Sequence, residues 1–180
     1  MFDMEENEKL RLAKCYSGAV HGVSARSVEI EVCASDGSPQ FTIVGLPDTA
    51  VKEAKDRVST AIGNSGFAKP ERNITVNLAP ADVKKEGPLY DLPIAVCLLA
   101  ATDKVKCRDL SEWGMVGELA LSGEIRRVRG VLPIVMRCVA SEEKACWYPW
   151  RTRRRRLSLT AYRCIPSGRC VRRSISLPKR

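Results

Sequence analysis

The feature that most constrains this chain is an unbroken apolar run at residues 94–101, directly after a loop rich in charge, glycine and proline. Such a run leaves a helix no polar face, so the helix must be buried on most sides. Pro93 fits the first turn, where no backbone N–H is needed, and Asp91 is expected to cap the helix by accepting from free N–H groups. Residues 77–101 therefore predict a polar loop on a rigid, buried base, which is a common way to build a site.

Hydrophobic periodicity around this helix predicts an α+β domain of layered elements. Residues 27–33 alternate Val and Ile with Glu, and residues 40–44 follow a turn, so 27–44 is expected to form a hairpin. The other expected elements are an amphipathic helix from Asp48 to about residue 62, a strand at 73–78, a hairpin of 115–121 and 125–128, a helix at 131–139 and a strand at 144–148.

Charge divides the chain into two parts. Residues 147–180 hold 11 of the 30 Lys and Arg residues and none of the 21 Asp and Glu residues. The remainder is therefore close to neutral, with a net charge of −2. We expect a flexible N-terminus at residues 1–10, one domain at 11–149, and an Arg-rich tail at 150–180 that is disordered or read out of frame.

Cysteine and hydropathy patterns indicate a cytoplasmic protein. The eight cysteines form no CxxC pair, and the single histidine, His21, has no cysteine at ligand spacing, so no metal site is expected. The acidic N-terminus lacks the apolar core of a signal peptide, and no run is long enough to span a membrane. We expect free thiols, a reducing compartment and no membrane partner.

Short motifs leave several functions open. Neither GxxxxGK[ST] nor GxGxxG occurs, so the GLPD stretch at residues 45–48 is interpreted as a structural turn. The carboxylates and lysines of residues 82–91 suit acid–base chemistry, although a solvated, capped loop is favoured. The Arg-rich tail suits phosphate neutralisation. It has few aromatic residues for base stacking, and a tail without a selected role remains equally open.

Long consecutive strings carry a family resemblance. They are AKCYSGAV (13–20), FTIVGLPDTAVKEAKDRV (41–58), NSGF (64–67), ITVNLAPADVKKEGPLYDLPIA (74–95) and VGELALSGEIRRVRGVLPI (116–134). Over about residues 13–146 the chain resembles the N-terminal domain of the YifB/ComM magnesium-chelatase-like family. The resemblance implies the layered fold of the Lon protease domain and of the second domain of ribosomal small-subunit protein five. That fold contains a left-handed βαβ crossover, an exception to the usual handedness.

In full-length members of this family the domain precedes an AAA+ ATPase module with Walker motifs. The resemblance implies that ATP and magnesium belong to that module, and that no cofactor belongs to this chain. Relatives similar to the competence protein are hexameric, ATP-driven DNA motors of natural transformation and branch migration. The implied partners are DNA and an AAA+ module or its hexamer. The change in composition near residue 147 motivates the hypothesis that the chain is a truncated fragment.

Comparison with Lon-type proteases implies a catalytically silent domain. Those proteases place a serine after a Gly-Pro pair and a lysine further on, where this chain has Leu89 and Leu132. Leucine supplies neither a nucleophile nor a base, so we expect no enzyme activity. The remaining expected role is recognition by a set of four loop residues, Lys84, Lys85, Glu86 and Tyr90. The alternatives are a degenerate Lon-type peptidase and a stand-alone nucleic-acid binder that uses the basic tail.

Overall fold

A mixed sheet of eight strands organises the fold, in the order β10-β9-β8-β5-β1-β2-β4-β3. The computed structural model describes residues 11–105, 110–140, 145–147, 158–164 and 170–176. The strands of this sheet are β1 (Arg11–His21), β2 (Ser24–Ser35), β3 (Gln40–Val44), β4 (Asn73–Ala79), β5 (Trp113–Met115), β8 (Ala145–Trp147), β9 (Ser158–Cys164) and β10 (Cys170–Ser176). A separate two-stranded sheet pairs β6 (Glu118–Leu119) with β7 (Ile125–Arg126).

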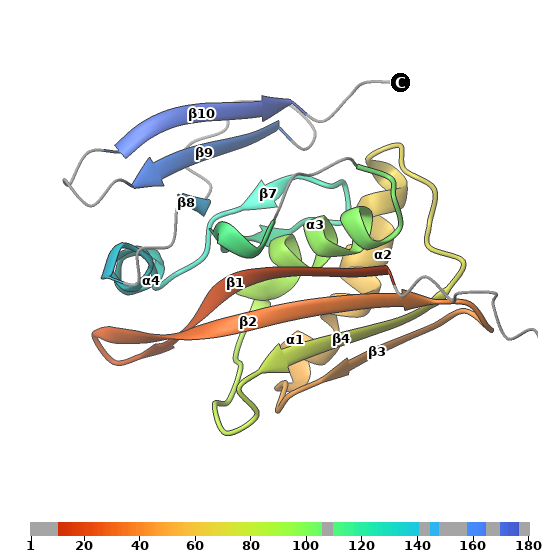
Figure 1. The fold of residues 1–180 in the computed structure, drawn as a ribbon, viewed down its shortest axis with the longest axis horizontal. Helices are drawn as coiled ribbons and strands as arrows, with labels where there is room; N and C mark the ends of the chain where they lie inside the picture. Colours follow the sequence, from red (N-terminus) through yellow and green to blue (C-terminus); the bar gives the residue numbers. More distant parts are fainter. Residues whose placement is uncertain (1–10, 106–109, 141–144, 148–157, 165–169, 177–180) are drawn as a thin grey trace, which may run out of the picture.

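Helices cover one face of the sheet. In Figure 1, the strands β1, β2, β4 and β3 lie in front of α2 and α3. The helices are α1 (Thr49–Lys52), α2 (Ala54–Asn64), α3 (Asp91–Ala101) and α4 (Val131–Ala140), with 3₁₀ turns η1 (Pro88–Tyr90) and η2 (Leu110–Glu112). The α+β prediction is confirmed at the level of a mixed sheet with helices packed on it.

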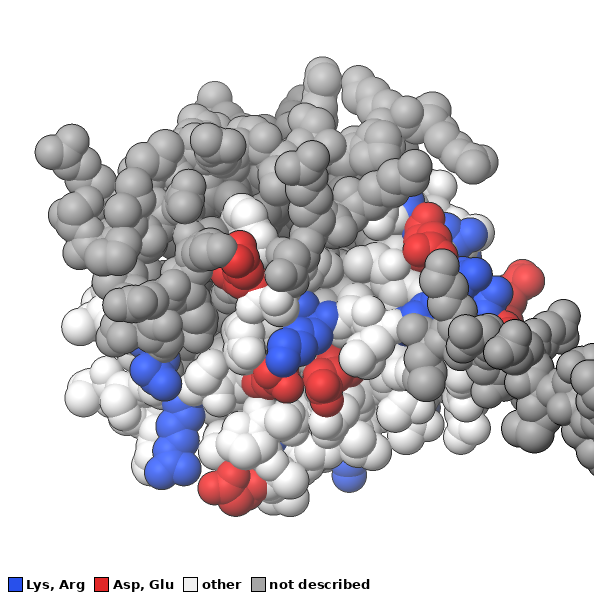
Figure 2. Space-filling view, viewed as in Figure 1, with Lys and Arg blue, Asp and Glu red and all other residues white. Residues whose placement is uncertain are grey.

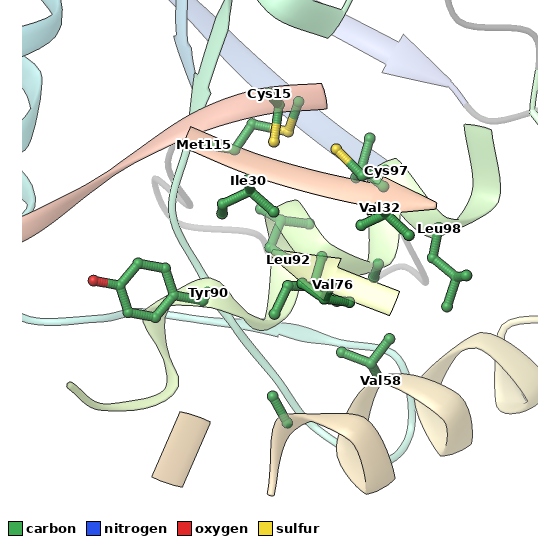
Figure 3. Packing of buried hydrophobic residues seen from close by; sticks show 14 of the residues in the cluster. Cys15, Ile30, Val32, Val58, Val76, Tyr90, Leu92, Cys97, Leu98 and Met115 are labelled. Carbon is green, nitrogen blue, oxygen red and sulfur yellow. The ribbon is translucent and has the colours of Figure 1, made fainter. Parts of the chain in front are cut away.

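The apolar helix α3 lies in the core, as the sequence predicts. Residues 94–99 are all less than 10% exposed, because α3 packs against β1 and β2 on one side and α2 on another. Figure 3 shows Cys97 and Leu98 of α3 among Ile30 and Val32 of β2, with Val58 of α2 nearby. The amphipathic helix prediction is also confirmed, since its five apolar positions, Val51, Ala54, Val58, Ala61 and Ile62, are buried. This helix is interrupted at Glu53, where α1 ends and α2 begins.

The expected hairpin over residues 27–44 is wrong. β2 pairs with β1 and with β4, and β3 pairs in parallel only with β4, so β4 lies between β2 and β3. A turn between two strands does not show whether they pair with each other or whether a third strand lies between them. The true N-terminal hairpin is β1–β2, in register from Arg11↔Ala34 to His21↔Ser24. The second expected hairpin is confirmed as β6–β7, although Met115, which the sequence analysis places in it, belongs to β5 of the main sheet.

Asp91 does not cap α3. Tyr90 is the N-cap, and Asp91 already has helical backbone angles because η1 leads straight into the helix. Its carboxylate instead receives two hydrogen bonds from Arg57 of α2, from Nε at 2.8 Å and from Nη2 at 2.9 Å. It also accepts from the Leu119 N–H at 3.2 Å. Arg57 Nη2 additionally donates to the Ala50 carbonyl at 2.8 Å. One carboxylate therefore joins α2, α3 and β6.

Two strands, β9 and β10, are described in the C-terminal region, for which the sequence predicts a tail that is disordered or read out of frame. β9 pairs with β8 at Tyr162↔Cys146, and β10 pairs with β9 along seven residues. Both segments contain residues with strand preference, such as Tyr162 and Ile175, and frequent arginines obscure that preference in the sequence. Residues 1–10, expected to be flexible, and the arginine run at 153–156 lie outside the described residues. Among the described helices, none is long and apolar enough to cross a membrane.

Removing the Asp91 carboxylate is expected to destabilise the fold strongly. The Asp91→Ala variant leaves the Arg57 guanidinium, whose side chain is 22% exposed, without its bidentate acceptor. We expect a loss of about 3 kcal/mol in the free energy of unfolding, measured by urea denaturation.

The matched control is Glu53→Ala. The Glu53 carboxylate lies 3.7 Å from Arg57 but is 63% exposed. Its removal is expected to cost less than about 0.5 kcal/mol. Equal losses in the two variants would show that the buried carboxylate has no special role.

Candidate functional site

Two loops meet at one edge of the sheet and form the candidate site. β3 and β4 are parallel neighbours, so the loops that follow them, residues 45–48 and 80–90, emerge at the same edge. The carboxyl ends of parallel strands are a frequent location for binding sites. The loops are bonded by their backbones: Lys85 N–H donates to the Leu46 carbonyl at 3.2 Å, and Asp48 N–H donates to the Lys85 carbonyl at 3.0 Å. We refer to residues 45–48 and 80–90 as the loop pair.

Asp48 fixes both halves of the loop pair. Its Oδ1 accepts from the Val51 N–H at 2.7 Å and caps α1, as the sequence predicts. Its Oδ2 accepts from the Gly87 N–H at 3.1 Å. Gly87 has a φ of 77° and a ψ of 179°, a combination that only glycine adopts readily. The carboxylate therefore holds a glycine-dependent turn against the start of a helix.

Gly45 permits the close approach of the two strands at this edge. It has a φ of 97°, and a Cβ placed on it would lie 2.0 Å from the Leu78 carbonyl oxygen. The next residue, Leu46, has a φ of 54° and is 56% exposed. The loop pair thus presents an apolar side chain beside its charged residues.

Two of the four predicted recognition residues are on the surface. Lys84 and Glu86 form an ion pair, with Nζ 2.6 Å from Oε1 and both side chains about two-thirds exposed. The hydrogen bond to Glu86 raises the pKa of Lys84. These two side chains are available to a partner, as a cation and an anion side by side.

The other two are buried. Lys85 is 0% exposed, and its ammonium donates to the Pro80 carbonyl. Burial lowers the pKa of Lys85, and the negative charge of Asp82 acts in the opposite direction. Tyr90 is 1% exposed, its hydroxyl donates to the Gly18 carbonyl at 3.4 Å, and burial raises its pKa. Lys85 and Tyr90 therefore shape the loop from the inside.

The two leucines at the positions compared with the protease dyad occupy different environments. Leu89 is 8% exposed and belongs to the core, whereas Leu132 is 70% exposed on α4. Elsewhere in the described residues, Ser17 Oγ is buried without a hydrogen-bond partner. No group of three metal-ligating side chains occurs within the described ranges. Neither leucine supplies a nucleophile or a base at these two positions.

A second polar cluster covers the open face of the sheet. Glu29 Oε2 is 2.8 Å from Lys14 Nζ and accepts from the Tyr16 hydroxyl at 3.0 Å. The hydrogen bond from Lys14 lowers the pKa of Glu29, that from Tyr16 adds to the effect, and burial acts in the opposite direction. Asn77 donates to Glu31 at 2.9 Å on the same face. Figure 2 shows Lys or Arg side chains beside Asp or Glu side chains on this face, so its charges are largely paired.

Sequence reasoning missed three contributions to the site. The second bond of Asp48, the Arg57–Asp91 pair and the burial of Lys85 all join residues from separate elements. Arg57 and Asp91 are 34 residues apart, so no local spacing marks them as partners. The exposure of Lys84 and Glu86 on a charged loop agrees with the sequence prediction.

Comparison with known proteins identifies the family. The family model for subunit ChlI of Mg-chelatase matches residues 30–150. The chain is 49% identical over 135 residues to the competence protein ComM of Haemophilus influenzae, covering 75% of this chain and 26% of that protein. It is 47% identical over 135 residues to the uncharacterized protein YifB of Escherichia coli K12, covering 75% and 27%. The YifB of Salmonella typhimurium is 52% identical over 123 residues, covering 68% and 24%. The chain thus spans about a quarter of the length of these relatives.

Burial of Lys85 predicts a pH dependence of stability. Its pKa in the folded chain is below the ordinary 10.5, so between these two values the unfolded chain binds more protons than the folded one. The contribution of Lys85 to the free energy of unfolding therefore rises with pH across that window. In urea denaturation, as the pH is raised towards 10.5, the wild-type stability should rise relative to that of Lys85→Met.

The adjacent Lys84 supplies the control. Its pKa is raised above 10.5 by Glu86. Its contribution to the pH dependence of the free energy of unfolding therefore falls above the pH range of the measurement. The stability difference between the wild type and Lys84→Met is expected to stay flat over the same range. A flat difference for Lys85→Met as well would contradict the burial of the Lys85 ammonium.

Proposed function

The chain belongs to the family of subunit ChlI of Mg-chelatase, where it corresponds to the N-terminal region of the YifB/ComM group, and we propose that it is a non-catalytic recognition or assembly domain. In this proposal the domain acts beside an AAA+ ATPase module. The loop pair provides the contact surface, with Lys84 and Glu86 as its exposed charged residues.

The observation that carries the proposal is the construction of the loop pair. Asp48, Gly45 and Gly87 hold the backbone in one conformation, while Lys84 and Glu86 extend from it into solvent. A rigid loop that presents charges loses little conformational entropy on binding. A site for nucleophilic catalysis would instead need a base poised next to a nucleophile. The described loop residues offer paired charges and a buried leucine.

For the fold, we propose the Lon-protease-domain type that ribosomal small-subunit protein five also contains. The support is the parallel pair β3–β4, connected through α1 and α2, which forms a βαβ unit on one face of the sheet. This is the unit in which the left-handed crossover is expected. Leu89 lies in η1, directly after the Gly87-Pro88 pair and before α3, and supplies no nucleophile there.

For the parent protein, we propose an AAA+ ATPase of the type of the competence protein. The present chain then corresponds to one part of a cytoplasmic, hexameric, DNA-processing motor, and ATP and magnesium are bound by the AAA+ module of that motor. The support is the 49% identity to ComM, of which the match covers 26%. DNA and the ATPase module are the proposed partners.

Two other functions are ranked below this one. A degenerate Lon-type peptidase is favoured only by the proposed fold. A stand-alone nucleic-acid binder is favoured by the 11 basic residues among residues 147–180. Because that binding depends on phosphate neutralisation, it would be steeply salt-dependent.

An assembly role predicts binding to the rest of a relative. We expect this chain to bind the part of the Haemophilus influenzae ComM that lies outside the match, in sedimentation velocity experiments. Exchanging the two exposed charges, with Lys84→Glu and Glu86→Lys together, keeps their ion pair but reverses the charges presented. Binding should weaken at least about tenfold, the equivalent of about 1.4 kcal/mol.

The matched control exchanges Lys69→Glu and Glu71→Lys, an exposed pair with the same spacing on another loop. This variant should bind as the wild type does. No binding of the wild-type chain, or equal weakening by both exchanges, would count against a role for the loop pair.

The lower-ranked functions predict different results. A fluorophosphonate probe is expected to leave every serine unlabelled, and labelling would support the peptidase. Deletion of residues 150–180 is expected to leave the ComM interaction unchanged. If the deletion abolishes a salt-sensitive binding to duplex DNA, measured by fluorescence anisotropy, the tail is a nucleic-acid binder.

A further inference from the structure

β3 forms a free edge of the main sheet. It is the last strand in the order β1-β2-β4-β3 and pairs only with β4. In Figure 1 it lies at the lower margin of the sheet, with β4 between it and β2. Within the described residues, the backbone groups of residues 40–44 make no hydrogen bond outside the β3–β4 ladder. Every second residue of β3 therefore points its N–H and C=O away from the sheet.

This edge lacks the usual protection against strand addition. Soluble proteins protect edges with charged residues, prolines, bulges or a covering element. Gln40–Val44 has the sequence QFTIV, which contains no charge and no proline. Its register with β4 runs without a bulge from Gln40↔Asn73 to Val44↔Asn77. The unpaired groups on this edge match the backbone of one more extended strand.

The β3 sequence is complementary to itself. An antiparallel pair of β3 strands centred on Thr42 places Phe41 opposite Ile43, Thr42 opposite Thr42, and Gln40 opposite Val44. Aromatic with β-branched residues and threonine with threonine are favourable cross-strand pairs. Phe41 and Ile43 are partly buried against the core, so their pairing would extend the apolar layer across the junction.

Charges near the edge do not oppose such a pairing. The helical segments that follow β3 carry two basic and two acidic exposed residues, Lys52, Lys55, Glu53 and Asp56. Residues 1–146 have a net charge of only −2. The net charge of +9 on the full chain comes from residues 147–180, and salt at physiological ionic strength reduces the repulsion that it causes between two copies.

From this edge we propose that a second copy of this chain docks through β3, in antiparallel register about Thr42, to form a two-fold symmetric dimer with one continuous sheet. The antiparallel arrangement follows from symmetry, because a two-fold axis makes the same patch contact itself. The contact is one short strand per copy, so the dimer is weak and forms at high micromolar concentration. This surface is separate from the loop pair and does not depend on the proposed function.

Two double variants at the same positions test the register. Gln40 and Val44 are both exposed and face each other across the proposed axis. Gln40→Lys with Val44→Lys places like charges opposite each other twice. Gln40→Lys with Val44→Glu places each new ammonium opposite a new carboxylate of the second copy. Sedimentation equilibrium of the full chain should show dimers for the wild type and the Lys/Glu variant, and at least tenfold weaker dimerisation for the Lys/Lys variant.

A third variant controls for added charge. Thr75→Lys adds a charge to the exposed side of β4, one strand away from the edge, and should dimerise as the wild type does. Thermal melting of all variants identifies any that fail to fold. The Lys/Glu variant changes the same two positions as the Lys/Lys variant, so it controls for the effect of substitution at those positions. A wild-type chain that stays monomeric up to near-millimolar concentration would overturn the proposal. Equal dimerisation of the two double variants would also overturn it, because it would exclude β3 as the contact.

Discussion

The bidentate contact between Arg57 and Asp91 is the interaction on which the arrangement of this domain depends. Asp91 opens α3, Arg57 belongs to α2, and the Leu119 N–H belongs to β6, so one buried carboxylate sets the relative positions of three elements. Burial raises the pKa of Asp91, and the hydrogen bonds from Arg57 and Leu119 act in the opposite direction. A buried ion pair adds little net stability compared with apolar packing, but it is very costly to break. Its effect is to select one packing of α2 on α3.

The loop pair depends on this arrangement. η1 connects the loop after β4 to the buried start of α3, and Asp48 connects the same loop to α1. Gly45 and Gly87 supply backbone conformations that other residues adopt only with strain. The loop backbone is thus held from both ends, and its exposed side chains, Lys84 and Glu86, are placed by the backbone rather than by a partner. Rigid support of this kind suits recognition.

Much of the fold could be predicted from local patterns, and the remainder depended on contacts between distant residues. The apolar run predicted the buried α3, and the spacing of Val51, Ala54 and Val58 predicted the amphipathic helix. The insertion of β4 between β2 and β3 could not be predicted, because strand order depends on non-local pairing. In the loop, charge predicted exposure correctly for Lys84 and Glu86. It failed for Lys85, whose burial depends on a carbonyl five residues earlier in the chain.

The neighbouring lysines of the loop pair also make it a natural reporter of local motion. Lys84 is exposed to any amine-directed acylating reagent in the folded state, whereas Lys85 is fully enclosed beside the Pro80 carbonyl. Acylation of Lys85 therefore requires transient opening of the loop, and its rate relative to that of Lys84, corrected for the raised pKa of Lys84, reports the equilibrium of that opening. Two adjacent residues with the same chemistry thus record, within one peptide, how often this edge of the sheet leaves its closed conformation.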